Sequence, residues 1–103
     1  MAVFAVTYAY QPDSLDARSE LRPQHLEFLE SLQAGGHLLA SGRLEAGGEP
    51  GALLVIAGDT AGTDTITEIA ELMDGDPFAQ HGLLASRHVR EWSIVFGSVG
   101  QQS

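Results

Sequence analysis

Alternating apolar positions at both ends of the chain predict a sheet protein. Residues 2–10, AVFAVTYAY, are rich in β-branched and aromatic side chains and end at the turn-forming QPDS, so they predict a first strand. Residues 37–46 and 52–58 predict a second and a third strand, joined by the hairpin loop GGEPG. Residues 85–97, ASRHVREWSIVFG, predict a long last strand.

Two segments between these strands have helical spacing. Pro23 suits a first helical position and the glycine pair 35–36 suits a C-terminal stop, which predicts a helix over about residues 23–34. Residues 14–21 are expected to form a helical turn leading into it. Residues 63–73, TDTITEIAELM, predict a second helix with Thr63 as its N-cap.

The resulting order, β-α-β-β-α-β, predicts the ferredoxin-like fold of the α+β class: a four-stranded antiparallel sheet with two helices on one face. Neither face of the strands at 2–10 and 52–58 carries a charge. Helices cover one face, so the other face would be apolar and exposed in a monomer. We therefore expect a homodimer formed through the open face of the sheet. Residues 1–97 are expected to form one domain and residues 98–103 a polar tail.

Composition limits the classes of function. The 103 residues suffice for one core, and the absence of cysteine excludes disulfides and thiolate metal sites. Fourteen acidic residues stand against five arginines and no lysine, a formal charge of −9, which disfavours nucleic acid and anionic membranes as partners. No membrane-length apolar run and no basic leader is present, so we expect a cytoplasmic protein. The spacing of the remaining histidines favours no metal site, and we expect no cofactor.

The stretch DGDPFAQHG, residues 74–82, offers a candidate for chemistry. Pro77 disfavours a helical conformation of Asp76 and holds it extended, where its side chain can turn back toward the helices. His25 falls within the apolar arc of the first predicted helix. If the two met, the carboxylate would orient the imidazole and fix its tautomer, as a general base requires. The alternatives are a core histidine bonded to a backbone carbonyl and an ordinary turn aspartate, and spacing alone leaves the contact open.

Three stretches together resemble the YciI-like family, whose members contain a YCII-related domain. They are RPQHLEFLESLQAGGHLLASG, DGDPFAQHGL and VREWSIVFG, and the resemblance spans about residues 2–97. It implies a dimeric α+β barrel. It also implies that the family's His–Asp pair falls on His25 and Asp76, in a small-molecule pocket near the dimer interface.

The same resemblance suggests a reaction. Some relatives are dehydrochlorinase-type lyases that act on chlorinated hydroxyaromatic compounds, with histidine as the proton-transfer group. That branch has a serine shortly before the aspartate, whereas this chain has Asp74, which puts the substrate in question. Arg22, three residues before His25, is a candidate for holding a substrate anion, with a surface ion pair as its alternative.

Ser41 and Gly42 are candidates for lining the same pocket. The leading hypothesis is therefore proton abstraction with elimination or isomerisation of a small organic acid or hydroxyaromatic. The alternatives are a non-catalytic small-molecule-binding module and a cofactor-free oxygenase.

Overall fold

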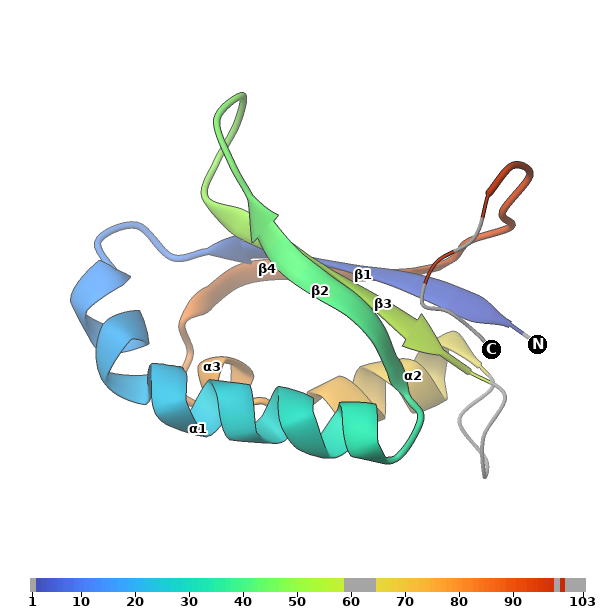
Figure 1. Ribbon diagram of the computed structural model, residues 1–103. Coiled ribbons are helices and arrows are strands. Elements are labelled where there is room, and N and C mark those ends of the chain that lie inside the picture. Colours follow the sequence, from blue (N-terminus) through green and yellow to red (C-terminus); the bar gives the residue numbers. More distant parts are fainter. Residues whose placement is uncertain (1, 59–64, 98, 100–103) are drawn as a thin grey trace.

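The four strands form one antiparallel sheet. The computed structural model describes residues 2–58, 65–97 and 99. The strands lie in the order β2-β3-β1-β4, with β1 at Val3–Tyr10, β2 at Leu38–Leu44, β3 at Gly51–Ala57 and β4 at Leu84–Glu91 (Figure 1). The central strand β1 is flanked by β3 and β4, both antiparallel to it. The sheet is four-stranded and antiparallel, as predicted.

All helices of the described chain lie on one face of this sheet (Figure 1). They are α1 at Leu15–Ala34, α2 at Ile66–Met73 and the short α3 at Pro77–Gln80. The predicted α+β, ferredoxin-like fold is confirmed, with α3 added between α2 and β4. None of the described helices is long and apolar enough to cross a membrane.

The core fills the space between the sheet and the helices. Alternate residues of β1 point toward the helices and are buried, namely Phe4, Val6 and Tyr8. They meet Leu54 and Ile56 of β3 and apolar residues of the two longer helices, Leu29, Leu32, Ile69 and Met73. Period-two burial on the strands and helical spacing on α1 and α2 thus enclose a single apolar layer.

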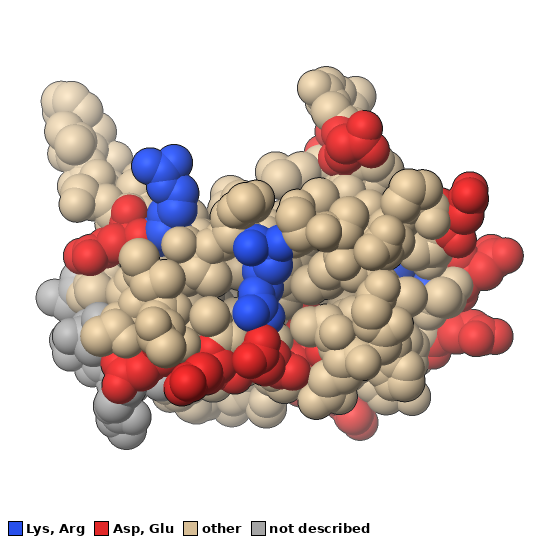
Figure 2. All heavy atoms as spheres, turned by 180° about the vertical axis from the view of Figure 1, so that it is seen from behind, with Lys and Arg blue, Asp and Glu red and all other residues tan. Residues whose placement is uncertain are grey.

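Charged groups are largely outside this layer. Acidic side chains are spread over the face seen in Figure 2, where basic atoms show in few places. Among the described residues, the buried polar side chains are Ser14, His25 and Asp76. Because burying a polar group is costly unless it is hydrogen-bonded, these three side chains mark the part of the core that needs explanation.

Both helix starts differ from the prediction. The start predicted at Pro23 is wrong, because α1 begins at Leu15 and contains Pro23 in its interior. The preceding stretch LDARSELR consists mostly of strong helix formers, which outweighs the one hydrogen bond that proline removes. Figure 1 shows α1 changing direction in its first half. The second helix begins at Ile66 with Thr65 as its cap, bonded to the Glu68 N–H; Thr63 lies outside the described residues.

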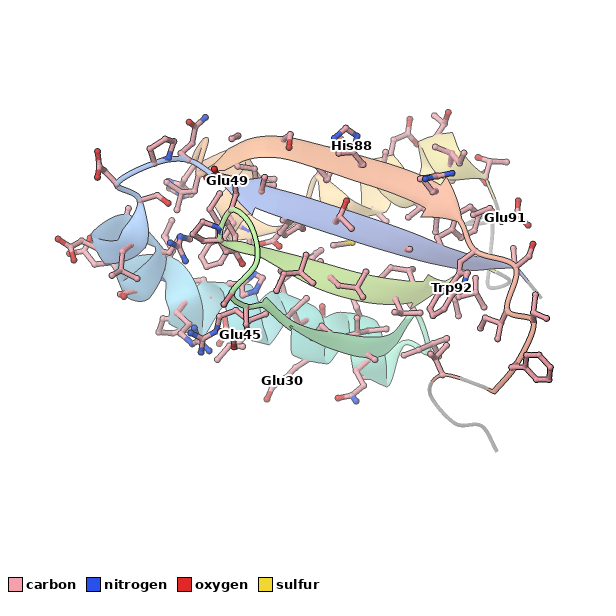
Figure 3. The ribbon with its side chains drawn as sticks, turned by 90° about the horizontal axis from the view of Figure 1, so that it is seen from above. Glu30, Glu45, Glu49, His88, Glu91 and Trp92 are labelled. Carbon is pink, nitrogen blue, oxygen red and sulfur yellow. The ribbon has the colours of Figure 1, made fainter. Side chains whose placement is uncertain are left out.

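The last strand is shorter than predicted. It ends at Glu91, opposite Phe4 of β1, rather than at residue 97. The Trp92 N–H still donates to the Val3 carbonyl at 2.7 Å, and the chain then leaves the sheet (Figure 3). Val95 and Phe96 follow, 85% and 93% exposed. Of the predicted tail, residues 98 and 100–103 lie outside the described residues.

A glycine at the start of β3 sets how closely β1 and β3 approach, and this can be tested. A Cβ at Gly51 would collide with the carbonyl oxygen of Tyr8, whereas a Cβ at Gly42 would meet nothing within 4 Å. We expect Gly51→Ala to lower the free energy of unfolding by about 2 kcal/mol or more, and Gly42→Ala to change it little. Urea unfolding of both variants measures the difference. Equal stabilities would contradict the close approach.

Candidate functional site

The segment between α2 and α3 positions Asp76. Helix α2 ends at Met73, and Asp76 is extended, with φ −69° and ψ 126°. Pro77 is the first residue of α3, and the Asp76 side chain caps that helix by accepting the Phe78 N–H at 2.9 Å. The proline therefore does more than stop a helix, because its fixed φ also suits the first position of the next one.

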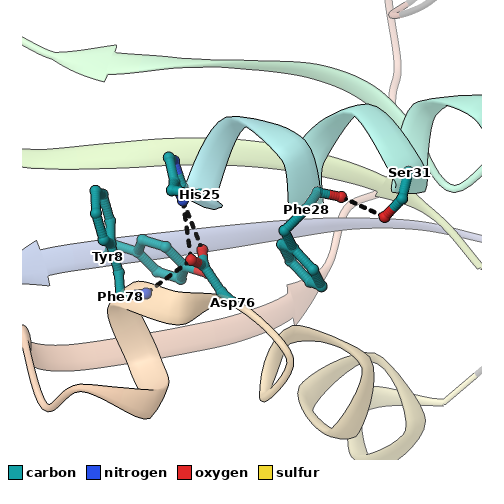
Figure 4. Close-up of polar contacts among 6 residues, drawn as sticks. All are labelled: Tyr8, His25, Phe28, Ser31, Asp76 and Phe78. Atoms are coloured by element: carbon teal, nitrogen blue, oxygen red, sulfur yellow. Dashed lines mark hydrogen bonds and ion pairs between the residues drawn. The ribbon is translucent and has the colours of Figure 1, made fainter. Parts of the chain in front are cut away.

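Three donors surround the Asp76 carboxylate, which is fully buried (Figure 4). Besides the Phe78 N–H, it accepts the Tyr8 hydroxyl at 2.8 Å on Oδ2. His25 Nδ1 donates to it from 2.9 Å to Oδ1 and 3.1 Å to Oδ2. The structure thus brings His25 and Asp76 into direct contact. With its hydrogen on Nδ1, a neutral His25 presents Nε2 as an unprotonated acceptor on the opposite side of the ring.

Aromatic contacts hold the imidazole plane. The ring of Phe78 stacks on that of His25, with centroids 4.1 Å apart and planes 7° from parallel. Phe78 is itself contacted edge-on by Tyr10 at 6.0 Å. His25 is 9% exposed, and within the described chain no hydrogen bond to its Nε2 is present. The ring is therefore fixed at one nitrogen and along one face, with the other nitrogen available to a ligand.

A cavity of about 280 Å³ adjoins His25. One face of α1 lines it with Leu15, Arg18, Ser19, Arg22, His25, Leu26 and Leu29, and β2 adds Ser41, Gly42 and Arg43. The predicted residues Arg22, Ser41 and Gly42 thus lie around the same cavity as His25, while Asp76 lies behind His25. The volume is at the small end of the range typical of ligand pockets.

Sequence reasoning missed several residues of this site: Tyr8, Tyr10, Arg18, Arg43 and Phe78. Two features of the sequence could have identified Tyr8 and Arg18. Tyr8 shares the parity of the buried Phe4 and Val6 on β1. Arg18 precedes Arg22 by four residues, which places both on one helix face once α1 is taken to begin at Leu15.

Burial and nearby charges determine the pKa values of the Tyr8 and Tyr10 hydroxyls. Burial, reinforced by the negative charge of Asp76 and by their hydrogen bond, raises the pKa of Tyr8 well above its ordinary value, so its hydroxyl remains a donor. Burial also raises the pKa of Tyr10, although the neighbouring charge of Arg18 acts to lower it. In the part of the chain that the structure describes, no three His, Asp or Glu side chains gather as metal ligands would.

Asp74, the residue that departs from the dehydrochlorinase pattern, has a partner. Its Oδ1 lies 2.9 Å from Nη2 of Arg87, and Asp74 is the C-cap residue of α2. Arg87 lies on β4 directly opposite Tyr8. The ion pair ties the end of α2 to the edge strand, and Asp74 does not line the cavity beside His25.

Comparison with known proteins gives a family match and solved structures of similar fold. The family model described as the YCII-related domain matches residues 2–93. The comparison with curated proteins gave no match. Among solved structures, 5-chloro-2-hydroxyhydroquinone dehydrochlorinase from Burkholderia phenoliruptrix, in complex with 2,5-dihydroxybenzoquinone, is similar with a TM-score of 0.73 and 24% identity, over 88% of this chain and 93% of that one.

Two further structures are more distant. A NIPSNAP domain protein from Burkholderia xenovorans has a TM-score of 0.57 and 14% identity, over 92% of this chain and 95% of its own. A NIPSNAP family protein from Agrobacterium tumefaciens has a TM-score of 0.55 and 17% identity, over 88% and 86% of the two chains. These likenesses show the fold, a four-stranded antiparallel sheet with its helices on one face.

The hydrogen bond from Tyr8 to Asp76 predicts a pH-dependent stability. The raised pKa means that Tyr8 stays protonated in the folded protein while the unfolded chain ionises near pH 10, so its contribution is full below pH 10 and is lost as the pH rises further. Tyr8→Phe should cost about 1–3 kcal/mol of unfolding free energy at pH 7. Above pH 10 the wild type should lose about 1.4 kcal/mol per pH unit more than the variant.

Urea unfolding of wild type and Tyr8→Phe from pH 7 to 11 tests this, using pH values about one unit apart. The two stability curves should converge at high pH. Curves that stay parallel would show that the Tyr8 hydroxyl is not buried against the carboxylate.

Proposed function

The chain belongs to the family of YCII-related domain proteins, and we propose that it is an acid–base enzyme of the lyase type, with His25 as its base and Asp76 as the group that orients it. The substrate would be a small organic acid or hydroxyaromatic in the cavity beside His25. The observation that carries the proposal is the buried Asp76 carboxylate, bonded to Nδ1 of His25 while Nε2 is left without a partner in the described chain.

This geometry suits an elimination. Nε2 of His25 would take a proton from the bound substrate, and the electron pair of the broken bond would form the new double bond. The leaving group would depart with its own pair, so that the products are the unsaturated compound and the acid of the leaving group. Asp76 would stabilise the imidazolium formed in this step, because its negative charge lies 2.9 Å from Nδ1. Arg22, Ser41 and Gly42 would contact the substrate across the cavity.

The dehydrochlorinase with a similar fold supports this class of reaction, since it was solved with a dihydroxylated quinone bound. At 24% identity it supports the class without identifying a substrate for this chain. Asp74 stands where the dehydrochlorinase pattern has a serine, which leaves the substrate of this chain open. Its carboxylate pairs with Arg87 and does not line the cavity beside His25.

We further propose that the chain forms a homodimer through the open face of its sheet. The residues of β1 and β3 that point away from the helices are apolar or small: Val3, Ala5, Thr7, Ala9 and Leu53 are partly exposed, and Val55 is already buried. Trp92, which lies at the end of β4 beside this face, is 39% exposed, and Leu44 of β2 is 42% exposed (Figure 3). A second copy would cover these groups and would lie beside the β2 edge, where Gly42 and Arg43 line the cavity.

The role of His25 is tested by substitution. We expect His25→Gln and Asp76→Asn each to lower turnover by about 10²-fold or more, because one removes the base and the other removes the partner that fixes its tautomer. Halide release from a panel of chlorinated hydroxyaromatics measures this. His81→Gln is the matched control, since His81 is exposed at the end of α3 and lies outside the cavity.

Two outcomes would contradict the enzyme proposal. Turnover that survives in His25→Gln would remove His25 as the base. A wild-type protein that binds such compounds without converting them, with affinity retained in His25→Gln, would instead identify a small-molecule-binding module.

The dimer is tested by placing a charge on the open face. Leu53, opposite Thr7 on the neighbouring strand, is half-buried in the single chain. Leu53→Lys should convert the dimer to a monomer in sedimentation velocity, because a charge would be buried between two apolar sheets. Glu30→Lys on the exposed side of α1 is the control and should leave the dimer intact. A wild type that is monomeric at micromolar concentration would overturn the proposal.

A further inference from the structure

Three of the five arginines line the cavity beside His25. Arg18 and Arg22 stand one turn apart on the face of α1 that also carries His25. Arg43 comes from β2, where it lies opposite Ala52, a buried residue that lines the same cavity. Two elements distant in sequence therefore deliver three permanent positive charges to one small space.

None of the three has a carboxylate partner in the part of the chain that the structure describes. This is notable in a chain with fourteen acidic residues, where the one arginine–carboxylate ion pair among the described residues joins Arg87 to Asp74. Arg18 is instead oriented by neutral groups: its Nε donates to the Ser14 hydroxyl at 2.9 Å, and its guanidinium lies 4.1 Å from the centre of the Tyr10 ring. These contacts hold the guanidinium without neutralising it.

The electrostatics of Tyr10 show that the three charges act on the same place. Burial raises the pKa of this phenol, and so does the negative charge of Asp76, whereas Arg18, Arg22 and Arg43 each act to lower it. The phenol therefore lies within electrostatic reach of all three guanidinium groups. An oxyanion bound there would gain the same attraction.

Two of these arginines, Arg18 and Arg43, mark the junction of two cavities. A second cavity, of about 570 Å³, shares Tyr10, Leu15, Arg18 and Arg43 with the first. The hairpin between β2 and β3 forms its other wall. That wall contributes Glu45 and Glu49, which Figure 3 shows on the hairpin, and Asp13 lies in the loop before α1. Apart from Arg18 and Arg43, the charged residues that line the second cavity are therefore all acidic.

We infer that Arg18, Arg22 and Arg43 form an oxyanion subsite at this junction, which holds the carboxylate or phosphate of an elongated substrate whose reacting group lies at His25. Guanidinium groups pair with such oxyanions through two parallel hydrogen bonds. Any part of the ligand that extends into the second cavity carries no further negative charge, because the three acids there would repel it. The inference rests on the proposed function for the position of the reacting group, but the subsite itself stands on the arginines.

Matched ligands test the subsite by binding alone. The probes are hydroquinone, which is uncharged, 2,5-dihydroxybenzoate, which adds a carboxylate to the same ring, and phenyl phosphate. Isothermal titration should show at least about tenfold tighter binding of one anionic probe than of hydroquinone. The anion with the larger gain identifies the oxyanion that the site prefers.

Arginine variants show whether the gain, the tighter binding of an anionic probe than of hydroquinone, comes from the subsite. Arg43→Gln and Arg22→Gln should each remove most of it, and both side chains are exposed, so the fold should tolerate the change. Arg90→Gln removes the same charge from β4, opposite Ala5 on the open face of the sheet, and should keep both the gain and the oligomeric state of the wild type. An equal loss in Arg90→Gln would show a general effect of net charge and overturn the subsite.

The remaining outcomes separate the subsite from the chemistry. His25→Gln should keep the preference for the anion, because the arginines are untouched. Equal affinity of all three probes, or no binding of either anion up to about 10 mM, would overturn the subsite even if His25 proves to be the base. A full anion preference in a protein with no turnover would uphold the subsite while the acid–base proposal fails.

Discussion

The buried carboxylate of Asp76 is the group on which the rest of the site depends. An ionised carboxylate without solvent costs several kcal/mol unless donors surround it. Its three donors come from three parts of the fold: the Tyr8 hydroxyl from β1, Nδ1 of His25 from α1, and the Phe78 N–H from α3. The sheet, the long helix and the short helix therefore meet at one group, so the contacts that hold the fold together here are the same contacts that orient His25.

This arrangement leaves little freedom to the imidazole. Asp76 is extended before Pro77, and its cap on α3 sets the position of Phe78, whose ring lies against His25. One residue thus fixes the ring twice, directly through Nδ1 and indirectly through the stacked phenyl group. An imidazole held on rigid elements in this way needs no rearrangement when a ligand arrives, which would favour the proton transfer that we propose for His25.

The sequence predicts the fold better than the site. The fold follows from patterns among neighbouring residues, whereas the site depends on contacts between residues far apart in the chain. The order of strands and helices along the chain follows from local periodicity, and the structure has the predicted four-stranded antiparallel sheet. The contact of His25 with Asp76 crosses 51 residues. It depends on how α1 and α3 pack, so spacing left it open and the family resemblance supplied it. Arg18 and Arg43 were missed for related reasons: Pro23 suggested too late a start for α1, and the direction of Arg43 depends on the register of β2 against β3.

The net charge of the chain and the local charge of the cavity favour different partners, because the two act over different distances. A charge of −9 spread over the surface repels any polyanion, since a nucleic acid is long enough to meet many acidic side chains at once. A small anion in the cavity is surrounded by three arginines at close range, while charges farther away than about 8 Å are largely screened at physiological salt. An acidic surface that disfavours nucleic acid is therefore compatible with the proposed subsite for small organic anions. The acids of the second cavity would sharpen that selection by rejecting ligands with a further negative group.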